Sequence, residues 1–245
     1  MLLEQTITKL NQMKLFGMVC ELNRQISTPD ISQLSFEERL SLLVDMETTT
    51  REDRRLSRLL KNAKLRENAC IEDINFKKDR ELDKSVILSL AACNWVRAHQ
   101  SVLISGPTGV GKTYIGCALA NAACRQGYSA HYYRTPRLLT ELKIARADGS
   151  IIKLLDRLAK IEVLVIDDWG INALSDLERK DLLEVIEDRY KVRSTIIMSQ
   201  LPIDKWHDAI GDPTLADAIL DRLVHNAYKI KMEGDSMRKH DRRLD

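Results

Sequence analysis

The sequence predicts an α/β protein, in which a three-layer αβα domain with a parallel sheet follows a small all-helical N-terminal domain. Three observations predict this class. Apolar strand-like runs alternate with helical segments between Ser101 and Met232. A glycine-rich motif typical of phosphate binding follows the first of these runs. Residues 1–67 show only helical periodicity, so we expect a helical domain over 1–67 and an α/β domain over 68–245.

Composition excludes several classes of protein. The 245 residues are 44% hydrophobic, and 38 Lys and Arg nearly balance 36 Asp and Glu, so the chain is no polycation and any basic surface must be local. Five cysteines without a CxxC pair favour free thiols in a reducing compartment. Charges within the first ten residues argue against a signal peptide, and no apolar run approaches about 18 residues. We therefore expect a cytoplasmic protein with no membrane partner.

The N-terminal residues are expected to form three helices. Apolar residues recur at three- and four-residue steps up to a break at Ser27–Asp30. Ser35 and Glu38 have the spacing of a capping box, which predicts that a second helix begins there. A third helix is expected over about 48–67, where neither Gly nor Pro occurs.

The third predicted helix carries a strong positive bias. Residues 51–66 contain seven basic and two acidic residues. At about 100° per residue the leucines share one face and the basic residues lie opposite. That basic face comprises Arg51, Arg54, Arg55, Arg58 and Lys61. It is either a solvated helix surface or a surface that contacts phosphates of duplex DNA, and the latter would make binding strongly dependent on salt.

The remaining elements alternate in the order expected of a parallel sheet covered on both faces. Strands are predicted over 102–105, 129–134, 163–166, 195–198 and 228–232. Helices are predicted over 82–96, 112–126, from Pro136 onward, and over 151–160, 177–190, 203–210 and 215–224.

A phosphate-loop motif provides the most specific functional signal. The pattern G-x-x-x-x-G-K-[ST] is met by Gly106, Pro107, Thr108, Gly109, Val110, Gly111, Lys112 and Thr113. It lies between a predicted strand and a predicted helix, as the motif requires. Its glycines let backbone N–H groups approach phosphate, and the helix N-terminus adds a positive dipole end. We expect ATP there, with Lys112 bridging the β- and γ-phosphates and Thr113 on Mg²⁺.

Two polar strand ends should complete the site. The run Val163–Ile166 ends in Asp167 and Asp168. Asp167 is predicted to lie near Mg²⁺, and Asp168 is the candidate base that orients the attacking water. The run ending at Ser199 and Gln200 is expected to lie between the acidic strand and the phosphate loop, so that one of these side chains points at the γ-phosphate or the water.

These motifs together resemble the AAA+ ATPases and, within them, the IstB/DnaC branch. The chain is particularly similar to IstB-type transposition helper ATPases. The similarity is carried by Gly106–Thr113 followed by Tyr114, by VLVIDDWG at 163–170, by Ser199–Pro202, by AILDRLVH at 218–225 and by the segment 230–238.

The resemblance implies a fold, a mechanism and partners. It implies an AAA+ fold, homo-oligomers assembled on duplex DNA with ATP between subunits, and a transposase partner. Arg222 would be an arginine finger that reaches a neighbour's γ-phosphate, and Tyr114 would belong to the nucleotide site. About 13 residues follow the last predicted strand, too few for the usual helical lid, so the lid is expected to be reduced or absent. Arg238 is the candidate substitute for the lid's sensor arginine. The second acidic residue is Asp168, where Glu is commoner.

Two other functions remain open from the sequence. A DnaC-like adaptor would use the N-terminal segment to bind a replicative helicase. A nucleotide switch would bind ATP to drive assembly without appreciable turnover. Since no base-reading helix is evident, DNA recognition is expected to rely on backbone and shape.

Overall fold

The structure is a computed structural model, and it describes residues 2–76 and 82–234. The chain divides into two compact units, Met1–Arg58 and Leu59–Asp245. Among the described residues, no helix has both the length and the apolar character needed to cross a lipid bilayer.

The first unit is helical. It contains α1 (Leu2–Gln12), α2 (Phe16–Ser27), the 3₁₀ turn η1 (Ile31–Gln33) and the larger part of α3 (Phe36–Ala63). α2 and α3 approach closely at Gly17, where a Cβ would lie 2.5 Å from the Met46 carbonyl oxygen. The buried Glu47 carboxylate accepts hydrogen bonds from the N–H groups of Gly17 at 2.7 Å and Met18 at 3.3 Å. These donors belong to the first turn of α2, so Glu47 satisfies groups that the helix itself cannot pair.

α3 confirms one prediction and corrects another. The Ser35 N–H donates to the Glu38 carboxylate at 2.7 Å, and the Glu38 N–H donates to the Ser35 hydroxyl at 3.2 Å, which is the predicted capping box. The separation into two helices near residue 48 is wrong, because α3 runs continuously from Phe36 to Ala63. No Gly or Pro interrupts these residues, so nothing ends the helix early.

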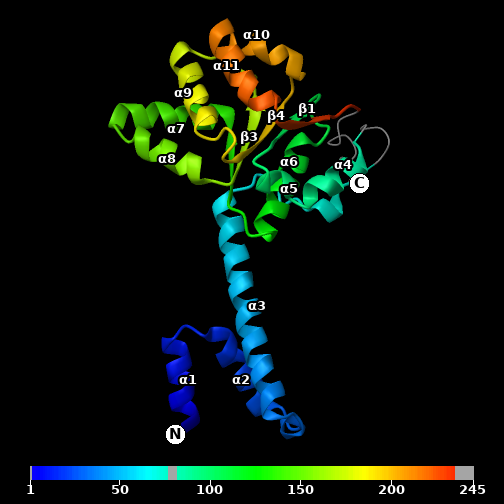
Figure 1. Cartoon of the computed structure of the whole chain (residues 1–245), viewed down its shortest axis with the longest axis vertical. Helices are drawn as coiled ribbons and strands as arrows, with labels where there is room; N and C mark the ends of the chain where they lie inside the picture. The colour runs from blue at the N-terminus through cyan, green and yellow to red at the C-terminus, as the bar shows by residue number, and fades with distance from the viewer. Residues whose placement is uncertain (1, 77–81, 235–245) are drawn as a thin grey trace, which may run out of the picture. The chain divides into compact units, whose positions relative to one another are not determined.

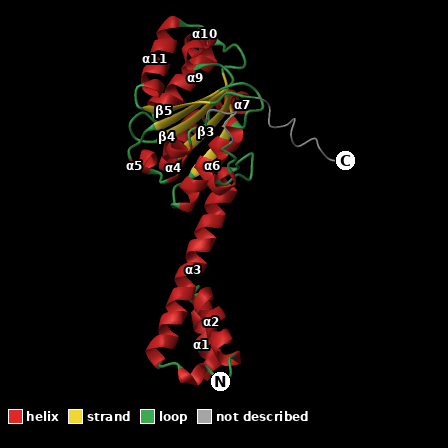
Figure 2. Ribbon diagram, turned by 90° about the vertical axis from the view of Figure 1, so that its right-hand side faces the viewer, coloured by secondary structure: helices red, strands yellow, loops and turns green. Residues whose placement is uncertain are grey.

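The second unit contains a five-stranded sheet with helices on both faces (Figures 1 and 2). The strands are β1 (Ser101–Ser105), β2 (Ala130–Arg134), β3 (Val163–Trp169), β4 (Ser194–Ser199) and β5 (Ala227–Lys231). Their order is β2-β3-β4-β1-β5, and all neighbours are parallel. The predicted α/β class is therefore confirmed, including the position of β4 between the acidic strand and β1.

Helices cover the two faces unequally. The helices of this unit are α4 (Lys84–Ala91), α5 (Asn94–Arg97), α6 (Lys112–Arg125), α7 (Thr135–Asp148), α8 (Ile151–Lys160), α9 (Asp176–Glu187), α10 (Trp206–Ile210) and α11 (Pro213–Val224), with 3₁₀ turns η2 (Ile71–Asp73) and η4 (Ile203–Lys205). One buried core joins α7–α11 to alternate strand residues such as Leu164 and Ile166. α6 packs on the other face, where Gly116 lies against Met198.

Most predicted elements of this unit are present, with one correction. The helix expected over 82–96 is divided into α4 and α5. Cys93 separates them in the left-handed conformation, with φ of 58°. The buried Trp95 indole then donates to the Leu90 carbonyl oxygen at 2.9 Å. Apolar residues continue through the break, so helical periodicity alone did not reveal it.

Candidate nucleotide-binding site

The phosphate loop lies between the end of β1 and the start of α6. Gly106, Gly109 and Gly111 have φ values of 151°, 89° and 97°, a region that side-chain-bearing residues rarely adopt. At Gly106 the backbone just after β5 also approaches closely, since a Cβ there would lie 2.1 Å from the Met232 carbonyl oxygen. The loop therefore needs glycine for conformation and for space.

Lys112 opens α6 and turns back over this loop. Its Nζ donates to the carbonyl oxygens of Gly106 and Pro107, both at 2.7 Å. Burial lowers the pKa of Lys112, while the charges of Asp167 and Asp168 act in the opposite direction. The amine thus lies among oxygen acceptors that phosphate oxygens could replace.

Thr113 and Asp167 bring two oxygen ligands together. The Thr113 Oγ1 donates to Asp167 Oδ2 at 2.7 Å, although 54 positions separate the residues. The Tyr132 hydroxyl donates to the same carboxylate oxygen at 2.8 Å. Asp167 is only 3% exposed. Hydroxyl and carboxylate oxygens next to a phosphate loop suit Mg²⁺, so the donor set fits the expected metal.

Asp168 has an unusual backbone and an arginine partner. Its φ is 60°, in the left-handed region, which is uncommon for a residue with a side chain and concentrates at functional sites. Its N–H donates to Asp167 Oδ1 at 2.8 Å. Arg134, the last residue of β2, donates from Nε to Asp168 Oδ2 at 2.6 Å. The local bend therefore directs the two consecutive carboxylates to different partners.

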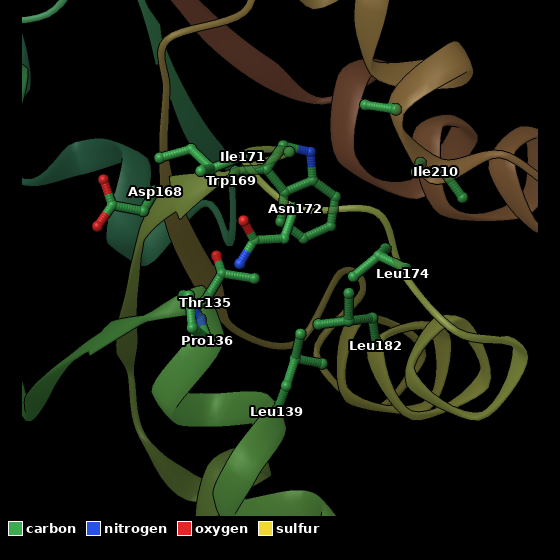
Figure 3. Close-up of a pocket in the computed structure, with 12 residues that line it drawn as sticks. Thr135, Pro136, Leu139, Asp168, Trp169, Ile171, Asn172, Leu174, Leu182 and Ile210 are labelled. Atoms are coloured by element: carbon green, nitrogen blue, oxygen red, sulfur yellow. The ribbon is translucent and has the colours of Figure 1, made fainter.

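A mostly apolar pocket adjoins Asp168 at the end of β3 (Figure 3). Its lining includes Leu139, Leu174 and Leu182. Figure 3 shows the Asp168 carboxylate pointing away from these side chains. Trp169 is buried and lies 5.8 Å from the Trp206 ring between centroids, so it packs in the core.

The two candidate polar residues after β4 have different environments. Gln200 Oε1 accepts a hydrogen bond from Thr108 Oγ1 at 2.7 Å, which places Gln200 at the phosphate loop. Ser199 is buried, donates to the Trp169 carbonyl oxygen at 2.7 Å and accepts from the Leu201 N–H at 3.0 Å. The Ser199 hydroxyl thus hydrogen bonds to backbone groups at the ends of β3 and β4, whereas the Gln200 side chain lies at the phosphate loop.

Arg222 does not join this group within one chain. It lines a hollow with Ser101 and Thr195, which lie at the amino ends of β1 and β4. The phosphate loop follows the opposite end of β1, and a five-residue strand spans roughly 13 Å. Arg222 forms an ion pair with Glu187 and donates from Nη1 to the Ala218 carbonyl oxygen at 2.8 Å.

Tyr114 and Arg238 complete the residues expected near the nucleotide. The Tyr114 hydroxyl lies beside the Cys70 backbone, and burial raises its pKa. Its hydroxyl is therefore directed at the segment before η2. Arg238 lies outside the described residues.

The basic face of α3 is exposed, as expected for either interpretation of its role. All five of its residues, Arg51, Arg54, Arg55, Arg58 and Lys61, are exposed. Arg51 pairs with Glu47 at 2.6 Å, and the Arg54 guanidinium lies 4.5 Å from the centroid of the Phe16 ring. On the opposite side Ala63 is fully buried and Leu56, Leu59 and Leu60 are partly buried.

Sequence reasoning missed three residues around the carboxylates: Arg66, Tyr132 and Arg134. Tyr132 and Arg134 are two positions apart on β2, so they share one face of the strand next to β3. That alternation, beside a strand ending in Asp-Asp, was a usable signal. Arg66 reaches the site from the segment after α3, and no local pattern identifies it.

Comparison with known proteins shows similarity along nearly the whole chain. The family described as IstB-like ATP binding protein matches residues 8–245. The insertion sequence ATP-binding protein y4pL of Sinorhizobium fredii is 46% identical over 243 residues, covering 99% of each chain. The IS1162 ATP-binding protein of Pseudomonas fluorescens is 51% identical over 203 residues, covering 82% of this chain and 88% of the relative.

A solved structure supports the fold alone. The crystal structure of DnaI superposes with a TM-score of 0.59 and 22% identity. The match covers 72% of this chain and 93% of that one. It supports the α/β P-loop architecture of the second unit, and the AAA+-like fold expected from the resemblance is confirmed.

Proposed function

Because the chain belongs to the IstB-like ATP-binding protein family, we propose that it is an ATP-dependent DNA-binding transposition helper. It assembles on duplex DNA, prepares that DNA for a transposase and hydrolyses ATP to ADP and phosphate at subunit interfaces. The Thr113–Asp167 hydrogen bond at the phosphate loop carries the catalytic part of the proposal, since it joins the two groups that hold Mg²⁺ in P-loop ATPases.

Each polar group at the loop has a role in this reaction. The loop N–H groups and Lys112 bind the phosphates, and Lys112 exchanges its two carbonyl acceptors for phosphate oxygens. Thr113 and Asp167 hold Mg²⁺, which neutralises charge that develops on the phosphates. Asp168 orients the attacking water, and Gln200 contacts the γ-phosphate or that water. The carboxylate exchanges part of its contact with Arg134 for the water.

Arg222 acts on a neighbouring subunit. It lies beyond reach of the phosphate loop of its own chain, as its place beside Ser101 and Thr195 indicates. An arginine that stabilises transition-state charge in trans contributes about 10³–10⁵ in rate. Hydrolysis then depends on assembly, and Glu187 holds the arginine until a neighbour binds.

The N-terminal segment, residues 1–67, supplies the DNA contact in this proposal. The exposed basic face of α3 can neutralise backbone phosphates without reading bases. Insertion sequence ATP-binding relatives that match 99% and 82% of this chain support a role alongside a transposase.

One experiment tests the proposal. ATP turnover is measured against protein concentration, with and without duplex DNA, while light scattering follows particle size. We expect specific activity to rise with concentration and DNA, and particles to grow with ATP. Turnover that is independent of protein concentration and of duplex DNA would contradict catalysis between subunits.

Two other outcomes would favour the alternative functions. Capture of a replicative helicase instead of a transposase would favour the helicase-loader alternative, and assembly with negligible turnover would indicate a nucleotide switch.

A further inference from the structure

The segment that follows α3 is attached to the edge strand of the sheet. Lys64, with φ of 49°, ends the helix in the left-handed conformation. The Asn62 carbonyl oxygen and the His131 Nδ1 lie 2.9 Å apart, which joins the last turn of α3 to β2. Two residues after Lys64, the Arg66 guanidinium lies beside the Tyr132 hydroxyl, an interaction that raises the pKa of Arg66.

Tyr132 joins this segment to the candidate magnesium site. A tyrosine hydroxyl has one proton to donate and can also accept. The neighbouring Arg66 guanidinium can only donate, which leaves the Tyr132 proton for Asp167 Oδ2 at 2.8 Å. The same carboxylate oxygen accepts from Thr113 Oγ1 at 2.7 Å. One continuous path of polar side chains thus runs from Arg66 through Tyr132 and Asp167 to Thr113 of the phosphate loop.

The direction of this path has a chemical consequence. A guanidinium that donates to the tyrosine oxygen polarises the O–H bond and strengthens its donation to the carboxylate. Outer-shell donors of this kind orient metal-binding carboxylates, and their loss typically costs 10- to 100-fold in metal affinity. The charges of Asp167 and Asp168 in turn favour the cationic Arg66.

We propose that Arg66 and Tyr132 are positioning residues for Asp167, through which the segment after α3 sets the affinity of the site for Mg²⁺–nucleotide. The proposal rests on the nucleotide chemistry proposed above. It assigns a catalytic-site function to a residue outside all the sequence motifs, on the segment next to the proposed DNA-binding face. Movement of that segment would alter metal-dependent nucleotide binding without touching the phosphate loop.

Tyr132→Phe tests the proposal, and Tyr133→Phe is its matched control. Tyr133 is the next residue on β2, but its hydroxyl donates to Glu141 at 2.9 Å, away from Asp167. The affinity of a fluorescent ATP analogue is measured by titration of the full chain, in Mg²⁺ and separately in EDTA. Tyr132→Phe should weaken binding in Mg²⁺ by about 10-fold or more and leave binding in EDTA unchanged, and Tyr133→Phe should change neither.

Arg66 provides an independent test. Arg66→Gln should weaken Mg²⁺-dependent binding in the same direction, and Arg66→Lys should restore part of it, because an ammonium can also donate to the hydroxyl. The double variant Arg66→Gln/Tyr132→Phe should be no weaker than Tyr132→Phe alone, since both changes break one path.

Two results would overturn this assignment. One is an equal loss in Mg²⁺ and EDTA, which would mean that Tyr132 supports the fold of the site only. The other is a Tyr132→Phe protein that keeps the wild-type response to Mg²⁺. Absence of ATP turnover in the wild type would be a failure of the proposed hydrolysis instead, and the metal-dependent binding measurements would still decide the roles of Arg66 and Tyr132.

Discussion

Arg134 Nε lies 2.6 Å from Asp168 Oδ2, and this ion pair joins the end of β2 to the carboxylate proposed to orient water. The Asp168 side chain is 17% exposed, so the pair is partly shielded from solvent. Asp168 has a left-handed backbone, and its N–H donates to Asp167 Oδ1 while its carboxylate accepts from Arg134. In the proposed function, these two consecutive acidic residues have two tasks, one at the metal and one at the water.

Asp168→Asn should therefore stop turnover without preventing ATP binding. The amide keeps the size of the side chain and cannot accept a proton, so kcat should fall by about 10²–10⁴-fold. Light scattering should show an ATP-bound oligomer that persists. Arg134→Gln removes the same ion pair and keeps the acid, so its effect on kcat should be smaller. Equal effects of the two variants would assign Asp168 a structural role.

Arg222→Ala should lower turnover by about 10³–10⁵-fold and leave nucleotide affinity unchanged. Glu187→Gln is the control, because it removes the same ion pair and retains the arginine. Mixing Arg222→Ala with Lys112→Ala should restore part of the activity, since some interfaces then combine an intact loop with an intact finger. Mixtures as inactive as their components would argue against action in trans.

Neutralising the basic face should remove DNA binding selectively. The triple variant Arg54→Gln/Arg55→Gln/Arg58→Gln should abolish binding to duplex DNA at moderate salt, and retain ATP binding. For the wild type, the logarithm of the DNA association constant should fall linearly with the logarithm of the salt concentration, with a slope of about −0.9 per neutralised phosphate. Lys153→Gln/Lys160→Gln on α8 is the control, because both lysines are exposed basic residues on another surface. Fluorescence anisotropy measures all three proteins, and equal affinities would place the DNA contact elsewhere.

Glu47 should make the helical unit sensitive to acid. Burial alone would raise its pKa, but hydrogen bonds from Arg51, Met18 and Gly17 more than compensate and hold the pKa below the ordinary 4.5. Its stabilising effect is therefore fully present above pH 4.5 and is lost as pH falls through the lower folded-state pKa.

Thermal unfolding of the full chain measures this effect. Glu47→Gln should destabilise the helical unit by about 1–2 kcal/mol at pH 7 and by less at acid pH, because the wild type loses the stabilising effect of the carboxylate as pH falls below 4.5. Glu52→Gln, at an exposed position of α3, should change stability little at either pH. A Glu47→Gln effect that is independent of pH would show that the carboxylate charge is not what caps α2.

The sequence by itself determined the order of the elements and the chemistry of the loop. Three of the patterns involve residues that are close in sequence: the spacing of the phosphate loop, the buried strand runs and the Ser35–Glu38 cap. They can therefore be recognised from the sequence alone. Helical periodicity predicted the wrong helix bounds in two places, because no local sequence signal marks where the helix breaks or continues. α3 continues beyond residue 48 because no Gly or Pro interrupts it. Cys93, in contrast, divides a predicted helix within an apolar run.

Only the tertiary structure decided which side chains meet. Neighbouring parallel strands brought Tyr132 and Arg134 of β2 to the carboxylates of β3, because side-by-side strands present their ends at one edge of the sheet. The Ser199 hydroxyl hydrogen bonds to the backbone at the end of β3, whereas the Gln200 side chain lies at the phosphate loop. Strand length separated Arg222 from the loop of its own chain. These are distances between residues remote in sequence, which spacing along one chain does not encode.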